Sequence, residues 1–446
     1  MSTKLFDIWF RLSSSLWFIP ALMVALSIGL WYGMIQLDGF LEESDSPFTW
    51  IFASSADGVR ALLAAIAGSI ITVAGVVFSI TIVVLSQSAA QFGPQLVKSF
   101  MQDKSTQLTL GIFSATFVYS LLTLGSVRGN GDSTNSQAAT ALAVLLSLAS
   151  IGILIRFIHN MARSVQSNRI IAGIIKEMGA SIGRVFPASS AKVTETDKKD
   201  EFKSFLPDDF DRTARPVLAS SNGFIQAIDL HKLLRAAEEK NVILKVRCTP
   251  GGFVSWKSAL VSAGPVGYLG EDFDERIRKA FVIGDDRTAE QDIEFSIERL
   301  SMIAVRALSP SINDPYTASI CIRWLGVMLC RLAGLNFHNS LHFDKEKKLR
   351  VITEPVSYGE FLDAAFNEIR HSAASPMVFL YLLENIGIIS EFINKPDDYS
   401  ALMRHAGYIE EESRRKLAGH DLQKVKEKFD SIVITLNANR PGAKQA

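Results

Sequence analysis

The sequence predicts an α-helical membrane protein with four transmembrane helices, followed by a cytoplasmic α+β domain. This domain is expected to contain a small β-barrel-like module and a helical C-terminal part. Charge is distributed unevenly, because residues 1–160 hold only 7 of the 46 Lys and Arg and 8 of the 46 Asp and Glu. Long apolar stretches fill this first part, whereas short β-prone runs and helical patterns follow it. We therefore divide the chain into residues 1–160, 161–212, 213–284 and 285–446.

Four stretches of the first part are long enough to cross a bilayer, which takes about 20 residues with few charges. The predicted spans cover residues 16–37, 61–86, 105–127 and 133–157. Trp17 and Trp31 sit near the two ends of the first span, where aromatic side chains anchor helices at the membrane surface. The second apolar stretch continues in polar residues and meets Pro94, which predicts a helix that projects beyond the bilayer and ends there.

The positions of basic residues indicate the orientation of the spans. Lys and Arg are enriched in cytoplasmic loops. Basic residues near the predicted spans include Lys4, Arg11, Lys98, Lys104, Arg156 and Arg163. They precede span one, lie between spans two and three, or lie at and beyond the end of span four, so both termini are expected on the cytoplasmic side.

Composition excludes several classes of protein. Equal numbers of basic and acidic residues give no basic excess for binding nucleic acid. Three cysteines, Cys248, Cys321 and Cys330, lack any metal-binding spacing, and we expect no metal and no cofactor. No phosphate-binding loop or hydrolase signature is present either, so we expect a protein that is not an enzyme.

Small or weakly polar residues recur at steps of three and four along the second span. This spacing places them on one face of a helix. The positions are Ala65, Gly68, Thr72, Gly75, Ser79, Ile82, Ser86 and Ala89, and Gln87 and Gln91 lie near the cytoplasmic end. We call this set the small-residue stripe. Ile82 is its one bulky member.

Two interpretations of the stripe remain open. Small residues let two membrane helices approach closely, so the stripe could be a packing face. Alternatively, Thr72, Ser79 and Ser86 could supply hydroxyl groups to a water-filled path at the axis of an oligomer, with Gly68 and Gly75 giving flexibility for gating. The spans carry no ionisable residue at mid-depth, which argues against a coupled pump.

Three separated motifs resemble a known family. They are VFSITIVVLSQSAAQFGP at residues 77–94, RTAEQD at 287–292 and ALSPSINDPYTA at 307–318. In this order they are similar to the bacterial family called domain of unknown function 2254. The resemblance implies a four-span protein of the bacterial inner membrane with a cytoplasmic tail, and it implies no activity.

The cytoplasmic part is expected to begin with a helical extension of span four and a charged linker, together residues 161–212. Runs of β-prone residues separated by turns at Asn222-Gly223 and at residues 250–252 then predict the barrel-like module over 213–284. Residues 285–446 show helical patterns, interrupted by one expected hairpin around residues 344–348.

A cluster of polar residues marks the start of the helical part. Thr288 with Gln291 and Asp314 before Pro315 have the pattern of helix N-terminal caps. A functional cluster is the alternative, either an ion-paired subunit contact or a ligand-sensing pocket. Its members would be Arg287, Glu290, Asp292, Arg306, Asn313 and Asp314.

Two functional hypotheses follow. The first is a homo-oligomeric inner-membrane ion channel or channel-like pore, lined by the second span and gated or assembled by the cytoplasmic domain. The second is a non-conducting scaffold or sensor that recruits partners through that domain. The expected partners are the lipid bilayer, other copies of the chain and a permeating ion.

Overall fold

The computed structural model describes residues 17–41, 56–92, 104–127, 137–164, 167–186, 210–265, 269–333, 335, 340–354 and 356–441. The chain divides into two compact units, Met1–Arg169 and Ile170–Ala446, which we call the N-terminal and C-terminal units. Each is described by itself below.

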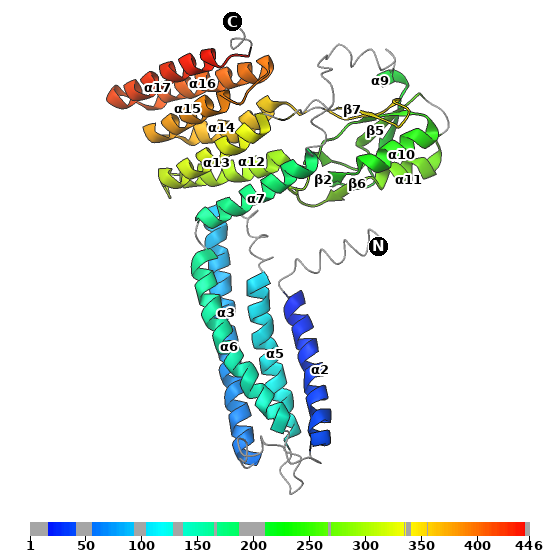
Figure 1. Cartoon of the computed structure of the whole chain (residues 1–446), viewed down its shortest axis with the longest axis vertical. Coiled ribbons are helices and arrows are strands. Elements are labelled where there is room, and N and C mark those ends of the chain that lie inside the picture. The colour runs from blue at the N-terminus through cyan, green and yellow to red at the C-terminus, as the bar shows by residue number, and fades with distance from the viewer. Residues whose placement is uncertain are drawn as a thin grey trace. The chain divides into compact units, whose positions relative to one another are not determined.

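The N-terminal unit is a bundle of long helices (Figure 1). Its members are α2 (Phe18–Leu41), α3 (Ala56–Phe92), α5 (Lys104–Ser126) and α6 (Gln137–Ser164). Helix α5 is the centre of the bundle, because it packs against each of the other three. A methyl group at Gly111 of α5 would lie 2.5 Å from the sulfur of Met23, so glycine permits the close approach of α2.

Helix α3 is longer than a bilayer requires. It has 37 residues, which correspond to roughly 55 Å at 1.5 Å per residue, against a hydrocarbon thickness of about 30 Å. It ends at Phe92, two residues before Pro94. After span four the structure describes helix α6 as far as Ser164 and helix α7 over Ser167–Val185.

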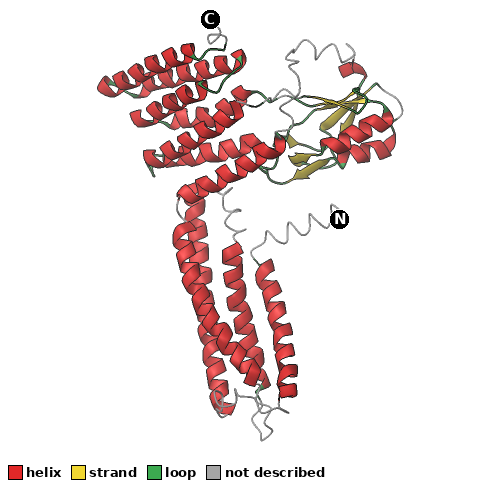
Figure 2. Cartoon of the chain, viewed as in Figure 1, coloured by secondary structure: helices red, strands yellow, loops and turns green. Residues whose placement is uncertain are grey.

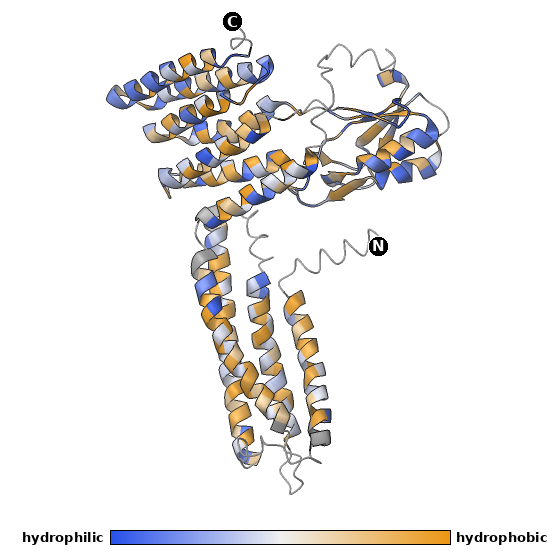
Figure 3. Ribbon diagram, viewed as in Figure 1, coloured by the Kyte–Doolittle hydropathy of each residue, from blue (hydrophilic) through white to orange (hydrophobic). Residues whose placement is uncertain are grey.

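The bundle helices are largely hydrophobic (Figure 3), and bulky apolar side chains lie on their outer surface. Leu26 of α2, Val83 of α3 and Leu148 of α6 are each more than 60% exposed. Water would make such a surface costly, at about 25 cal/mol for each Å² of apolar area, whereas lipid tails solvate it. The outer surface therefore suits a lipid environment.

Five described helices are long and apolar enough to cross a membrane. Four of them lie in the N-terminal unit. The fifth is Pro315–Ala333 in the C-terminal unit, and 61% of its apolar window is buried by protein, against 6% to 39% for the other four.

The C-terminal unit combines two sheets with packed helices (Figure 2). Its first part contains the short helix α9 (Phe210–Thr213), α10 (Leu230–Lys240), α11 (Gly270–Arg278) and eight strands. The strands are β1 (Arg215–Leu218), β2 (Gly223–Ile228), β3 (Ile243–Val246), β4 (Phe253–Val254), β5 (Ala259–Gly264), β6 (Phe281–Gly284), β7 (Leu341–Phe343) and β8 (Leu349–Ile352).

The predicted β-barrel-like module is wrong. The described strands form two open sheets, of order β1-β5-β3-β8-β7 and β4-β2-β6. Strand β4 has only two residues, and the hairpin β7–β8 joins the larger sheet through a parallel pairing of β3 with β8. Side chains of α10 and α11, such as Leu233 and Ile277, complete the core, so helices bury the sheet and no closed barrel is needed.

The second part of the C-terminal unit consists of six helices. They are α12 (Ile293–Ala307), α13 (Pro315–Ala333), α14 (Tyr358–Ser372), α15 (Pro376–Ser390), α16 (Pro396–Lys416) and α17 (Gly419–Ala438). Helices α12, α14 and α16 pack in one row, and α13, α15 and α17 pack in a second row. Three helix pairs are thus stacked, as in α-solenoid repeats.

The neighbouring helices α13 and α15 run parallel. In the second row, Gly326 of α13 lies beside Asn385 of α15, and Arg323 stacks on Tyr381 at 4.6 Å. Further along the row, a methyl group on Gly387 of α15 would lie 2.7 Å from Ile432 of α17. Where the residue numbers of contacting positions increase together along two neighbouring helices, the helices are parallel.

Candidate functional site

The small-residue stripe lies on the outer face of α3. Ala65, Gly68, Thr72, Gly75, Ser79, Ile82, Ser86 and Gln87 are exposed, and Ala89 is half-buried. The side chain of Gln91 lies outside the described residues. The opposite face of α3 is buried in the bundle through Val59, Leu63, Ala67, Ile70 and Val77.

Glycines of the stripe do not serve helix packing within the described chain. A methyl group at Gly68 or Gly75 would have no described neighbour within 4 Å, in contrast to Gly111 on α5. The hydroxyl of Thr72 donates a hydrogen bond to the carbonyl oxygen of Gly68 at 2.7 Å, so it is satisfied without another helix. The stripe is therefore free to contact lipid, water or a second copy.

A polar interior of the bundle was not predicted from the sequence. The buried residues of α5 are mostly hydroxyl-bearing, and Thr116 contacts Ser150 of α6 at 3.3 Å. The hydroxyl of Tyr119 donates to the carbonyl oxygen of Ala139 at 3.1 Å. Thr106, Thr109, Thr116, Ser120 and Thr123 follow steps of three, four or seven, so helical periodicity was a usable signal.

Arg287 and Asp292 of the predicted polar cluster form an ion pair before α12. The Nε atom of Arg287 lies 2.8 Å from Oδ2 of Asp292, whose side chain is 3% exposed, and Nη1 lies 2.6 Å from Oε2 of Glu298. The guanidinium also stacks on Phe295 at 5.1 Å. Burial works against its charge, but the carboxylates outweigh burial and raise the pKa of Arg287.

Asp292 is also the N-terminal cap of α12. Its Oδ1 atom accepts a hydrogen bond from the backbone N–H of Phe295 at 2.9 Å. A methyl group at Gly251, which has a φ of +86°, would lie 2.0 Å from Oδ2 of Asp292. The turn at residues 250–252 therefore packs directly on the Arg287–Asp292 pair.

Asp314 caps α13 in the same way. Its Oδ1 accepts from the backbone N–H of Thr317 at 3.0 Å, and Oδ2 accepts from the hydroxyl of that residue at 2.5 Å. Asn313, before it, is exposed and has a φ of +45°, in the left-handed region that Asn tolerates.

The structure does not bring the six predicted residues together. Asp292 precedes the first residue of α12, whereas the backbone N–H of Asp314 donates to Ala307, the last residue of that helix. A helix of 15 residues separates the two caps, which is roughly 22 Å. Arg306 lies in the last turn of α12, and Glu290 is exposed.

The predicted capping box of Thr288 and Gln291 is wrong. Gln291 instead pairs with the backbone of Ile228 in β2, accepting from its N–H at 2.8 Å and donating to its carbonyl at 3.2 Å. Thr288 donates to the carbonyl of Gln226. The motif at residues 287–292 thus joins the small sheet to α12.

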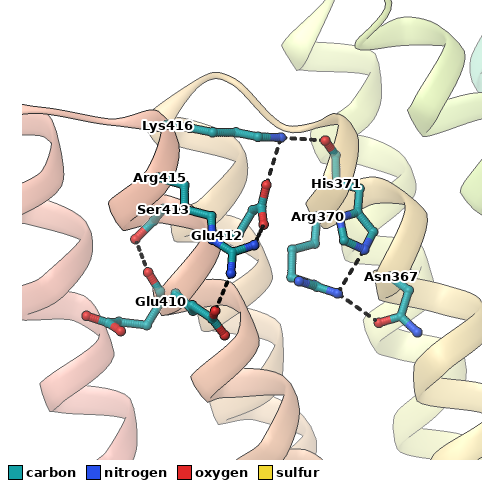
Figure 4. Close-up of polar contacts among 9 residues, drawn as sticks. Asn367, Arg370, His371, Glu410, Glu412, Ser413, Arg415 and Lys416 are labelled. Atoms are coloured by element: carbon teal, nitrogen blue, oxygen red, sulfur yellow. Dashed lines mark hydrogen bonds and ion pairs between the residues drawn. The ribbon is translucent and has the colours of Figure 1, made fainter.

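Charged residues at the ends of α14 and α16 form a separate network (Figure 4). Lys416 donates to the carbonyl of His371 and pairs with Glu412 at 3.2 Å. Burial acts to raise the pKa of Glu412, but the hydrogen bond and charge of Lys416, with Arg415, hold that pKa below its ordinary value. These opposite charges compensate one another, so stabilisation of the fold is a sufficient explanation for the network.

No three His, Cys, Asp or Glu side chains of the described residues come together as around a metal ion. His342 contacts the hydroxyl of Thr353 at 3.3 Å, and Asp344 pairs with Arg350 at 2.7 Å. These two polar residues of the β7–β8 hairpin are thus engaged with other side chains.

Apolar helices with bulky outward side chains define the class: a membrane protein with several transmembrane helices. The particular family follows from the sequence, because residues 13–386 match DUF2254, described as predicted membrane proteins. The chain belongs to this family, which confirms the resemblance of the three motifs.

Mycobacterial relatives share most of the chain. Similar proteins include uncharacterized proteins of Mycobacterium tuberculosis (strain H37Rv) and Mycobacterium bovis. Each is 28% identical over 417 residues, which cover 91% of this chain and 78% of the relative. No solved structure matches the chain significantly.

Proposed function

We propose that the protein is a homo-oligomeric pore of the bacterial inner membrane, lined by the small-residue stripe of several copies. The observation that carries this proposal is the outward position of the stripe. Much of the outer surface of the bundle bears bulky apolar side chains, whereas this face, apart from Ile82, presents small residues and hydroxyl and amide groups. A face of this composition suits close contact between copies around a narrow polar path.

The proposal places four helices in the membrane. Helix α13 is apolar enough to be a fifth span, but most of it is buried among α12, α14 and α15. Its apolar residues thus have a protein core to fill, and a bilayer is not required for them. With four spans and the observed distribution of Lys and Arg, both termini and the C-terminal unit lie in the cytoplasm.

The C-terminal unit would assemble or gate the pore and would carry no catalytic activity. The polar residues that suggested a ligand site, Asp292 and Asp314, are engaged as helix caps. Since this unit follows the last span directly along the chain, a ligand or partner bound to it could change the packing of the membrane helices.

Ion flux tests the pore directly. Purified protein in liposomes is expected to conduct a small cation or anion, and Gly75→Leu is expected to reduce flux at least about tenfold by filling the path. Ile151→Phe on the lipid-facing side of α6 adds similar bulk and serves as the matched control. Equal flux in both variants would contradict the proposal.

A non-conducting scaffold is the alternative. It is favoured by the apolar residues that the C-terminal unit exposes on α13 and α15, such as Val327 and Ile388. A protein that stays silent in liposomes and is unaffected by Gly75→Leu, yet retains a folded C-terminal unit, would support the scaffold.

A further inference from the structure

An exposed apolar groove runs between α13 and α15 in the C-terminal unit. Its volume is about 770 Å³, and its lining includes Val327, Cys330, Ile388 and Phe392. Val327, Ile388 and Phe392 are 44%, 46% and 47% exposed, although each is a large apolar residue. Contiguous apolar surface of this kind commonly marks a contact with another molecule.

Charged residues border the groove in two rows. The arginines Arg323 and Arg331 project from α13, and Glu384 and Glu391 belong to α15 and its C-terminal cap. All four are exposed. Within the described residues none of them takes part in an ion pair, and the guanidinium of Arg323 stacks on the ring of Tyr381. A basic row and an acidic row thus face solvent side by side.

The two rows are in register. Because α13 and α15 run parallel, Arg323 lies at the level of Tyr381 and Glu384, near the start of the groove. Arg331 lies at the level of Glu391 and Phe392, near its end. Burial, with the nearby carboxylate of Glu391, raises the pKa of Cys330 to about 11, which agrees with this register.

We infer that this face binds the same face of a second copy through a two-fold axis that runs along the groove, parallel to α13 and α15. Rotation about this axis leaves every residue at the same position along the helix direction. It places the arginine row of one copy opposite the glutamate row of the other. Arg323 then faces Glu384 of the second copy, and Arg331 faces its Glu391. The apolar residues between the rows meet one another, as an isologous interface requires.

Charge is the reason to choose a second copy over another occupant. The groove carries equal numbers of unpaired arginine and glutamate, so an anionic lipid would meet as much repulsion as attraction. In a second copy of the same face, each arginine of one copy lies opposite a glutamate of the other, and the reverse also holds. The inference rests on the homo-oligomer of the proposed function and names one of its subunit contacts, but it does not depend on conduction.

Disulfide crosslinking in full-length protein tests this contact. Two forms of the chain, one with Val327→Cys and one with Ile388→Cys, are co-purified in a Cys330→Ala background and oxidised. We expect a covalent dimer, and we expect little with Lys424→Cys, an exposed position on α17, in place of Ile388→Cys. Adding Arg331→Glu to both chains should lower the yield about tenfold, because the carboxylate introduced at position 331 of each chain then faces the like charge of Glu391 of the other, on both sides of the axis.

Exchanging the two charges of one pair provides the decisive comparison. Combining Arg331→Glu with Glu391→Arg should restore the yield, whereas Lys424→Glu should leave it unchanged. Absence of the Val327–Ile388 crosslink, or a yield insensitive to these charges, would overturn the inference, as would a monomer with lipid in the groove. A Ser79→Cys crosslink on α3 is scored separately. If it forms while the groove crosslink fails, this inference is lost and the pore proposal stands.

Discussion

Close contacts at single residues explain much of the packing in the C-terminal unit. Gly326 of α13 touches Asn385 of α15, which is buried and donates a hydrogen bond to the carbonyl of Tyr381 at 2.9 Å. A methyl group at Gly326 would lie 1.7 Å from Oδ1 of Asn385, so α13 and α15 could not keep their present distance. In the same unit, Gly407 of α16 has free space around it.

These two glycines give a matched pair of predictions. Gly326→Ala should lower the free energy of unfolding by about 1 to 3 kcal/mol, the usual cost of overpacking a core. Gly407→Ala should be neutral or stabilise by up to about 1 kcal/mol, since alanine favours a helix more than glycine. Thermal and urea unfolding of both variants measure the difference. A neutral Gly326→Ala would show that the described approach of α13 and α15 is wrong.

His405 is the one fully buried histidine among the described residues. Its Nε2 lies 3.1 Å from Oδ1 of Asp363 without the alignment of a hydrogen bond, and its ring lies between Phe366 and Tyr408. Burial lowers the pKa of His405 to about 4; Asp363 opposes this shift, and Arg404 and Arg370 add to it.

The low pKa of His405 predicts acid sensitivity. Between pH 6.5 and pH 4 the unfolded chain binds a proton at this position and the folded chain does not, so stability falls as the pH falls through this window. The loss by pH 4 is on the order of 3 kcal/mol. His405→Phe keeps the ring packing and should show a shallower decline in urea unfolding at about pH 7, 5.5 and 4.5. An unchanged slope would contradict the assignment.

At the scale of elements, the sequence predicted the membrane spans, because physical limits fix their length and composition. Each of α2, α3, α5 and α6 overlaps a predicted span, because crossing a bilayer requires an uncharged stretch of known length. Helix ends were predicted less precisely: the described helix α3 begins at Ala56, five residues before the predicted start of the second span.

Elements built from distant segments could not be predicted. The hairpin β7–β8 joins the larger sheet by pairing with β3, about one hundred residues earlier, and no local pattern encodes that contact. Helix α10 was missed although Asp229 and Asn241 cap its two ends, which is a usable signal. Both facts explain why a barrel was predicted where two sheets and two helices occur.

The start of α12 provides a test at this scale. Asp292→Ala removes the cap and the buried ion-pair partner of Arg287, and we expect destabilisation of about 2 kcal/mol. Glu290→Ala, at an exposed position two residues earlier, should change stability by less than about 0.5 kcal/mol. If Asp292→Ala left stability unchanged and abolished flux instead, the residue would belong to a functional site.

At the scale of the whole molecule, the small-residue stripe was predicted as a pattern, but its surroundings were not. The spacing of Gly68, Gly75 and Ser79 is the same whether the face packs inside the subunit or outside it. The structure places it outside the described bundle, which leaves lipid, a second copy or water as neighbours. Assembly depends on contacts between chains, and the geometry of these contacts cannot be predicted from the residue pattern of a single sequence.

Accessibility of the stripe to water tests the central claim most directly. Single cysteines at Ser79 and at Leu148, an exposed apolar position on α6, are introduced without the native cysteines and treated in liposomes with a charged, water-soluble thiol reagent. We predict rapid modification at Ser79→Cys and protection at Leu148→Cys, since only the first would face a water-filled path. Protection of both positions would contradict the pore.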